Sequence, residues 1–299
     1  MPALEGGRGH QSNRVVWMEW AADVGYPEAV VFVSGMLNGA FAMGTPDAIS
    51  HLAEEIHSPE TNVPKAMALQ IGLGFISGFA FLVPMLYAIN DFDALQTSSF
   101  PLGELYRQAT WTNAGAIGLL CVTLLPVLGC VIGLYVTAGR TLWTLARDGA
   151  TPRSAYFGKV HRSLAMPMRA TLLSAVLTTL IGGIALASST AFQSFVSSFI
   201  QMSTASYMAS LMPFVLRRRR GLRFGPFKMP DILGMCVNSA ACIYMVLAFG
   251  IYCLPSSLPT SAKTINYAPV IWAGCTALIA LFWTCFAGKR YSGPRLPIT

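Results

Sequence analysis

Ionisable side chains gather in and just after one apolar stretch of the chain. Asp47, His51, Glu54 and Glu55 all fall within the segment NGAFAMGTPDAISHLAEE, residues 38–55. A carboxylate at membrane depth is costly, so it usually serves a site, where it attracts a cation or takes part in proton coupling. Adjacent carboxylates can also do acid–base work. HLAEE lacks the second histidine of the HExxH metalloprotease motif, and no catalytic residue, metal site or cofactor is predicted.

The same segment has the pattern of a helix that stops and starts again. Gly39 and Gly44 loosen the backbone, and Thr45-Pro46-Asp47 has the order of a helix start: a hydroxyl N-cap, then proline, then a carboxylate. Lipid cannot satisfy the unpaired N–H groups of a break, so they must face protein, water or a ligand. We therefore predict a substrate-binding segment with these residues: Asn38, Gly39, Ala40, Phe41, Ala42, Met43, Gly44 and Asp47.

Each of these features also has a plain structural interpretation. The break can be an ordinary Gly/Pro kink in a membrane helix. Asp47 can simply complement the dipole of the restarted helix. The Phe41 ring, which can stack on an ammonium group, can equally serve packing. Both interpretations stay open on these residues alone.

A second group of charged residues points to a gate rather than to catalysis. Glu54 and Glu55 come at the end of the broken stretch, and Arg147-Asp148 follow a later apolar run. Near the membrane surface, salt bridges between such residues are more natural than acid–base chemistry. We predict that Glu54, Glu55, Arg147 and Asp148 form an inner gate network.

The composition predicts an all-α polytopic membrane protein. Of the 299 residues, 54% are hydrophobic and 11% are charged, about half the charge of a soluble protein. Several apolar runs reach the roughly 20 residues that cross a bilayer. The net charge of +7 does not indicate nucleic-acid binding, because the basic residues cluster in particular loops. The seven expected spans are about 27–55 (broken), 66–89, 114–139, 168–187, 192–216, 231–254 and 268–287.

The distribution of Lys and Arg predicts the orientation. Most of them follow spans one, three and five or lie in the C-terminal tail, which places those segments in the cytosol. Residues 1–26 are then an extracellular lead-in, 27–287 a single transmembrane domain and 288–299 a cytosolic tail. The run Arg217–Arg220 is interpreted as an anchor near anionic lipid.

Three separated segments resemble one transporter family. DAISHLAEEIHSPETNVPKAM resembles the sixth helix and following loop of the amino acid–polyamine–organocation permeases, and TLWTLARDGATPRSAYFGKVHRSLAMPMRA resembles the loop between their eighth and ninth helices. NYAPVIWAGCTALIALFWTCFAGKRYSGP resembles the last helix of the fungal amino acid/choline branch. The resemblance implies two inverted five-helix repeats plus two helices, of which this chain supplies helices six to twelve.

The resemblance also implies a function. By position, Phe41 is the family's aromatic gate, residues 40–44 are its substrate-binding segment, and Asp47 falls where relatives often carry an acid. Pro46 departs from the bulky residue common there. We expect a secondary active transporter of amino acids or small amines such as choline or GABA, proton-coupled and in the plasma membrane. The first repeat is missing, so the chain looks truncated and is expected to be inactive alone.

Two other functions are considered. A seven-span receptor, or an accessory membrane protein, would share the predicted orientation, with its N-terminus outside. Against a receptor, the seventh span lacks an NPxxY-like ending, and the first span is broken where a receptor helix would be continuous. An intramembrane enzyme has no catalytic pair to support it.

Overall fold

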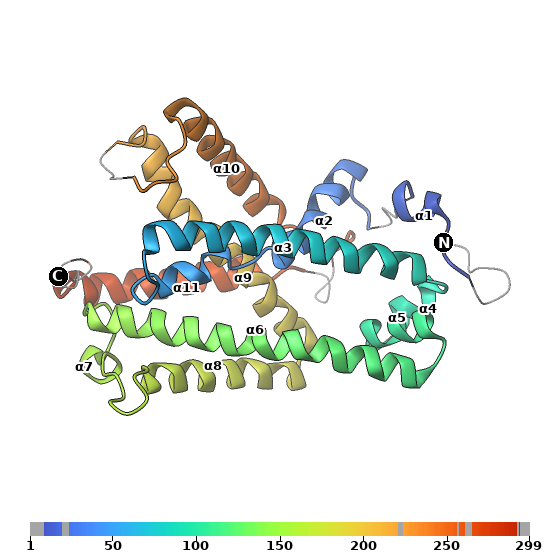
Figure 1. The fold of residues 1–299 in the computed structure, drawn as a ribbon, viewed down its shortest axis with the longest axis horizontal. Coiled ribbons are helices and arrows are strands. Elements are labelled where there is room, and N and C mark those ends of the chain that lie inside the picture. Colours follow the sequence, from blue (N-terminus) through green and yellow to red (C-terminus); the bar gives the residue numbers. More distant parts are fainter. Residues whose placement is uncertain are drawn as a thin grey trace. The chain divides into compact units, whose positions relative to one another are not determined.

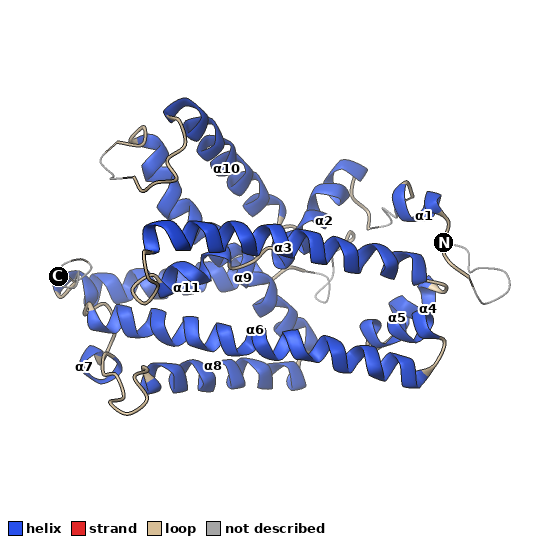
Figure 2. Cartoon of the chain, in the orientation of Figure 1, coloured by secondary structure: helices blue, strands red, loops and turns tan. Residues whose placement is uncertain are grey.

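The computed structural model describes residues 9–19, 24–220, 224–255, 257–260, 265–291 and 293. Helices make up nearly all of the regular structure in these ranges (Figure 2). The chain forms two compact units. One comprises residues up to 21 together with 69–134, and the other comprises 22–68 together with 135–299.

Within the described ranges, seven helical segments are long and apolar enough to cross a membrane. They are α2 (Glu28–Ala42) with the 3-10 helix η1 (Pro46–Leu52), α3 (Pro59–Ala88), α6 (Asn113–Arg147), α8 (Met168–Ala187), α9 (Ser189–Leu216), α10 (Asp231–Ile251) and α11 (Ala268–Cys285). The prediction of an all-α polytopic membrane protein is confirmed. α6 runs 35 residues, about 50 Å, well beyond the roughly 30 Å of a hydrocarbon core. Arg140, which the sequence placed in a loop, therefore lies on this helix.

The first unit contains two short helices between the predicted spans 66–89 and 114–139. α4 (Phe92–Thr97) is capped by Asp91, whose Oδ1 accepts a hydrogen bond from the Ala94 N–H at 3.0 Å. α5 (Pro101–Thr110) carries Gln108, whose Oε1 accepts from the backbone N–H groups of Asn90 and Asp91 at 2.8 and 3.0 Å. These bonds satisfy backbone groups that a loop would leave to water, so the connector folds.

The second unit is organised around α9. This helix packs against α8, α10 and α11, and α10 also contacts α2 (Figure 1). A small buried cluster, formed by Ile200 on α9 and by Ala248 and Tyr252 at the end of α10, marks where these helices meet. Leu37, Ala40 and Phe41 of α2 pack against the same cluster. The predicted binding segment is therefore seated on α9 and α10.

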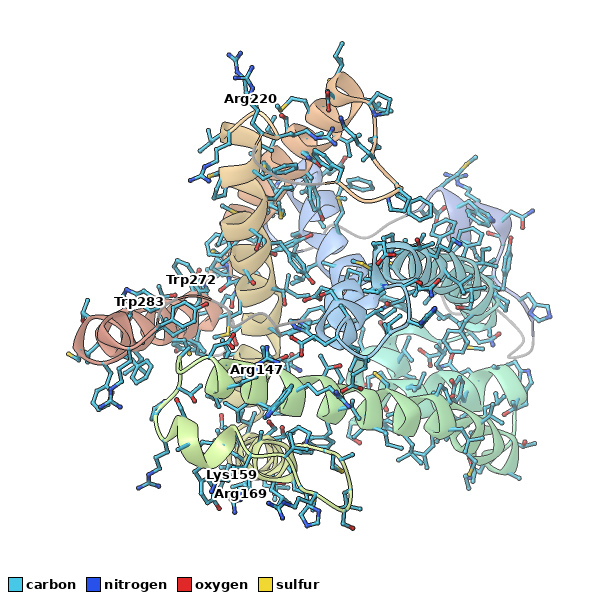
Figure 3. All side chains as sticks on the ribbon, turned by 60° about the vertical axis from the view of Figure 1, so that its left-hand side comes forward. Arg147, Lys159, Arg169, Arg220, Trp272 and Trp283 are labelled. Carbon is cyan, nitrogen blue, oxygen red and sulfur yellow. The ribbon has the colours of Figure 1, made fainter. Side chains whose placement is uncertain are left out.

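One residue of the basic run after α9 has a structural role. Arg219 is buried, and its guanidinium donates to the carbonyls of Met229, Pro230 and Asp231 at 3.3–3.4 Å, just where α10 begins. The guanidinium also lies 5.2 Å from the Phe224 ring centroid. Arg220 is exposed at the end of α9 (Figure 3). Arg219 therefore bonds the start of α10. The interpretation of the run as a lipid anchor does not describe this residue.

Candidate functional site

The predicted helix break is present, but its geometry differs from the expected restart. α2 ends at Ala42, and η1 begins with Pro46 at its first position. Thr45 has φ 57° and ψ 40°, in the left-handed region, whereas an N-cap residue normally has extended backbone. Its hydroxyl consequently makes no capping bond to η1. The prediction of a Thr45 hydroxyl cap was wrong, and the segment restarts as a tighter 3-10 turn.

A cavity of about 460 Å³ lies beside the break, between α2, α9 and α10. We name it the aromatic cavity after four of its lining residues, Phe199, Tyr207, Tyr244 and Tyr252. Of the predicted binding residues, Gly39, Ala40, Met43 and Gly44 contribute to its wall. Lysine, arginine, histidine and carboxylate side chains are absent from the lining formed by the described residues. The cavity is thus uncharged, and its most distinctive groups are π faces.

The remaining predicted residues lie outside this lining. The Phe41 ring stacks on Phe199 with centroids 6.3 Å apart and an interplanar angle of 26°. Phe41 also packs against the buried cluster of Ile200, Ala248 and Tyr252. Phe199, rather than Phe41, therefore lines the cavity, and Phe41 stacks against Phe199. Asn38 and Ala42 are absent from the described lining.

The lining aromatics on α9 and α10 were missed by the sequence reasoning. Phe199, Ser203 and Tyr207 recur at a spacing of four residues on α9, which places them on one helix face. Such a stripe of aromatic and hydroxyl groups is a detectable signal. It did not show that this face meets the break, because that depends on how α9 packs against α2.

Asp47 is held by two neighbours. The Tyr207 hydroxyl donates to Asp47 Oδ1 at 2.6 Å, and His51 Nε2 lies 3.4 Å from Asp47 Oδ2. Asp47 also stands in the first turn of η1, as the helix-dipole interpretation expected. The carboxylate is joined to the aromatic cavity by its hydrogen bond with Tyr207, which lines it. Asp47 therefore links the restarted helix to α9 and to the cavity wall.

The predicted gate residues form ion pairs in the second unit. Arg147, at the C-terminal end of α6 (Figure 3), makes a two-pronged bridge to Glu54, with Nη1–Oε2 at 2.8 Å and Nη2–Oε1 at 3.0 Å. Arg147 Nε lies 3.4 Å from Asp148 Oδ1. Glu55 pairs with Arg140 instead. Arg140 and Arg147 are seven residues apart, two helical turns, so one face of α6 receives both carboxylates.

This pairing affects the ionisation of Glu54. Its hydrogen bonds from Arg147, helped by the guanidinium charge, lower the pKa of the Glu54 carboxyl below its usual value, while partial burial opposes the shift. Asp148 is buried, with 6% of its side chain exposed. Three of the four predicted gate residues, Glu54, Arg147 and Asp148, are thus in contact, whereas Glu55 pairs with Arg140, which was not predicted. Their role in gating stays a prediction.

The family model described as amino acid permease matches residues 3–275. The chain belongs to the amino acid permease family. The resemblance drawn from the three sequence segments is confirmed. No solved structure matches the chain.

Curated relatives of this chain include proteins named for different solutes. It is 32% identical over 263 residues to a choline transporter of Saccharomyces cerevisiae, covering 87% of this chain and 46% of that one. It is 28% identical over 278 residues to an amino-acid permease of Arabidopsis thaliana, covering 89% of this chain and 53% of that one. It is 26% identical over 282 residues to a polyamine transporter of Saccharomyces cerevisiae, covering 92% of this chain and 45% of that one. The chain spans about half the length of these relatives, whose names are those of permeases and transporters, not enzymes or receptors.

Proposed function

We propose that the protein is a secondary active transporter of small amines, and that the aromatic cavity holds the ammonium group. The observation that carries this proposal is the lining: Phe199, Tyr207, Tyr244 and Tyr252 surround an uncharged space beside the helix break. A quaternary ammonium has no N–H to donate, so aromatic faces recognise it better than hydrogen-bond acceptors do. The choline and polyamine transporters among the relatives support a cationic solute.

The same lining favours amines over amino acids. An amino acid brings a carboxylate, which would need a cation or a set of N–H donors when buried. The described lining contains no cationic side chain. Asp47, joined to the wall through Tyr207, supplies negative charge instead. An amino acid without net charge remains the second candidate, since an amino-acid permease is among the relatives.

We further propose proton coupling and alternating access in the plasma membrane, with the C-terminus in the cytosol. Asp47 and His51 are two titratable groups in contact, and Asp47 is bonded to a residue of the cavity wall. Their protonation can therefore influence the cavity. The Glu54–Arg147 and Glu55–Arg140 pairs would open and close the inner side. Breaking a helix at a binding site is the general device of secondary transporters.

Binding of choline to residues 1–299 tests the aromatic cavity. Residues 1–299 in lipid nanodiscs would be titrated with radiolabelled choline and with its neutral carbon isostere, 3,3-dimethylbutan-1-ol. A cation–π contact contributes about 0.5–2 kcal/mol, so we expect choline to bind at least about tenfold more tightly than the isostere. Equal affinities for the two probes would refute recognition of the positive charge.

Variants of one lining residue separate charge recognition from packing. Phe199→Leu keeps an apolar side chain without a π face, and it should weaken choline binding about tenfold. Phe199→Tyr retains the ring and should stay within about threefold of the wild type. If Phe199→Leu binds choline as well as Phe199→Tyr does, the aromatic cavity is not the ammonium site.

A further inference from the structure

A groove of about 450 Å³ lies on the face of α9 that points away from the aromatic cavity. Ala205 lines this groove, whereas Ser203, two positions earlier and therefore about 200° away around the helix, lines the aromatic cavity. Phe249 of α10 and Trp272 of α11 complete the wall. Charged, hydroxyl and amide side chains are absent from the lining that the described residues form. We name it the apolar groove.

The part of the groove on α9 is one stripe of small and apolar side chains. They recur at spacings of three and four residues, which places them on one helix face: Ala205, Met208, Ala209, Met212, Pro213 and Leu216. From Ala205 to Leu216 the helix rises about 16 Å, at 1.5 Å per residue. One leaflet of a hydrocarbon core is about 15 Å thick. The stripe therefore has the length of one lipid acyl chain.

The groove is open to its surroundings. Leu216 is 76% exposed, and Ala209 and Met212 are exposed as well. On a membrane helix, exposed apolar side chains contact lipid rather than water. The rings of Phe249 and Trp272 lie 5.1 Å apart at 71° and support each other. Figure 3 shows Trp272 beside α9. The groove is thus a lipid-facing corner with an aromatic wall.

The segment directly after α9 is basic. α9 ends at Leu216, and three of the next four residues are exposed arginines: Arg217, Arg218 and Arg220 (Figure 3 labels Arg220). We name them the arginine cluster. Within the described part of the chain, none of the three forms an ion pair. Asp231, at the start of α10, pairs with Lys228 at 3.3 Å instead. Because Leu216 also lines the groove, unpaired positive charge begins where the groove ends.

We propose that the apolar groove and the arginine cluster form a binding site for one anionic glycerophospholipid. One acyl chain lies along α9 between Ala205 and Leu216, and the phosphate pairs with guanidinium groups of the cluster. Guanidinium groups bind phosphate through paired hydrogen bonds. A sterol or a neutral lipid would fill the groove but bring no net negative charge to the cluster. The orientation predicted from Lys and Arg places this lipid in the cytosolic leaflet, where anionic lipids gather.

Selectivity for the headgroup tests the arginine cluster. Residues 1–299 in detergent would be titrated with dioleoyl phosphatidylserine and with dioleoyl phosphatidylcholine, and bound lipid counted by native mass spectrometry. We expect one equivalent of phosphatidylserine, bound at least about tenfold more tightly than phosphatidylcholine, since each arginine near the headgroup contributes about fivefold. The triple variant Arg217→Gln/Arg218→Gln/Arg220→Gln should lose this preference. Equal affinity of the wild type for the two lipids would overturn the site.

A matched triple variant separates a site from general attraction by net charge. Arg153→Gln/Lys159→Gln/Arg162→Gln removes the same charge from exposed residues of the loop after α6, on the same predicted side of the membrane. It should bind phosphatidylserine within about twofold of the wild type. If it loses as much affinity as the variant of the arginine cluster, the binding reflects net charge and the proposal fails.

Trp272 reports where the acyl chain lies. In phosphatidylcholine nanodiscs, a small fraction of phosphatidylserine brominated on its acyl chains should quench tryptophan fluorescence more than the same fraction of brominated phosphatidylcholine does. Trp272→Phe should remove this difference. Trp283→Phe, on the same helix and outside the described lining, should keep it. A difference that survives Trp272→Phe would place the lipid elsewhere.

Filling the groove tests the same point without a fluorescent reporter. Ala209→Phe puts a ring into the stripe and should weaken phosphatidylserine binding at least about tenfold. Ser210→Phe adds a ring at the next position, which is exposed and outside the described lining, and should stay within about threefold of the wild type. Equal affinities of Ala209→Phe and the wild type would show that no acyl chain occupies the groove.

Discussion

The two halves of the broken first span are held by different forces. The N-terminal half, α2, rests on the α9–α10 cluster through apolar and aromatic contacts, with Phe41 stacked on Phe199. The C-terminal half, η1 and the turn after it, is held by polar contacts: Asp47 with Tyr207, Glu54 with Arg147, and Glu55 with Arg140. We therefore expect charge to matter little for the N-terminal half and to matter for the C-terminal half.

Under the proposed function, this difference would let one helix serve both binding and gating. Apolar contacts are non-directional, so a shift of α2 over α9 would leave none of these contacts with an unpaired polar group. Ion pairs and hydrogen bonds are directional, so a movement of the C-terminal half would have to break specific bonds. A proton or a change in ionic strength would then act mainly on the C-terminal half. The predictions below test this division, from the largest expected effect to the smallest.

The first prediction concerns the packing of the N-terminal half, α2. Phe41→Ala should destabilise the chain by about 2 kcal/mol, below the 3–5 kcal/mol of a fully buried ring, since Phe41 is only half-buried. Unfolding in sodium dodecyl sulfate, followed by circular dichroism, measures the change. The loss should be equal at 50 mM and 500 mM salt. A loss that shrinks strongly at high salt would mean that α2 is also held by charge.

The second prediction concerns the bond between η1 and α9. Asp47→Ala removes the acceptor and Tyr207→Phe removes the donor of a 2.6 Å hydrogen bond to a carboxylate, a type worth about 1.5–3 kcal/mol. The double variant should cost little more than either single one, which gives a coupling energy of about 1.5 kcal/mol in the same unfolding assay. Phe41→Ala combined with Tyr207→Phe is the matched comparison and should be nearly additive. Additive losses from Asp47→Ala and Tyr207→Phe would mean that the bond contributes nothing.

The third prediction concerns the ion pairs after η1. Glu54→Gln and Arg147→Gln should couple by about 0.5 kcal/mol, because the Glu54 side chain is 48% exposed and solvent screens the pair. Glu55→Gln with Arg147→Gln should show no coupling, since Glu55 pairs with Arg140. Stronger coupling of Arg147 to Glu55 than to Glu54 would contradict the pairing seen here.

The fourth prediction is the pH dependence of that pair. Because Arg147 lowers the pKa of Glu54, the stabilisation is complete above the ordinary glutamate value near 4.5 and is lost as pH falls through the lowered value. The difference between wild type and Arg147→Gln should therefore be constant from pH 8 to 5 and shrink below pH 4.5. Its full size is under about 1 kcal/mol, given the exposure of both groups. A difference that grows on acidification would have the wrong sign for this mechanism.

The sequence predicted the helices better than it predicted the site. Length and apolar content suffice for membrane helices, because the bilayer requires every backbone group to be bonded within its own segment. The break was equally predictable from the sequence, since Gly44 and Pro46 act on the local backbone. Thr45 was misjudged because its left-handed backbone, visible only in the structure, removes the capping geometry. Arg219 was misjudged because burial by Phe224 and by the start of α10 depends on packing.

By itself, the sequence determined the family, the seven membrane helices and the break between Ala42 and Pro46, since each follows from local composition or from residue order. Tertiary structure alone decided which side chains share a cavity. Phe41, beside the break, stacks on Phe199 and is absent from the described lining. Tyr207 and Tyr252, which do line the cavity, come from segments far along the chain. The physical reason is that side-chain neighbours across helices are set by which faces pack together, and that information is not local.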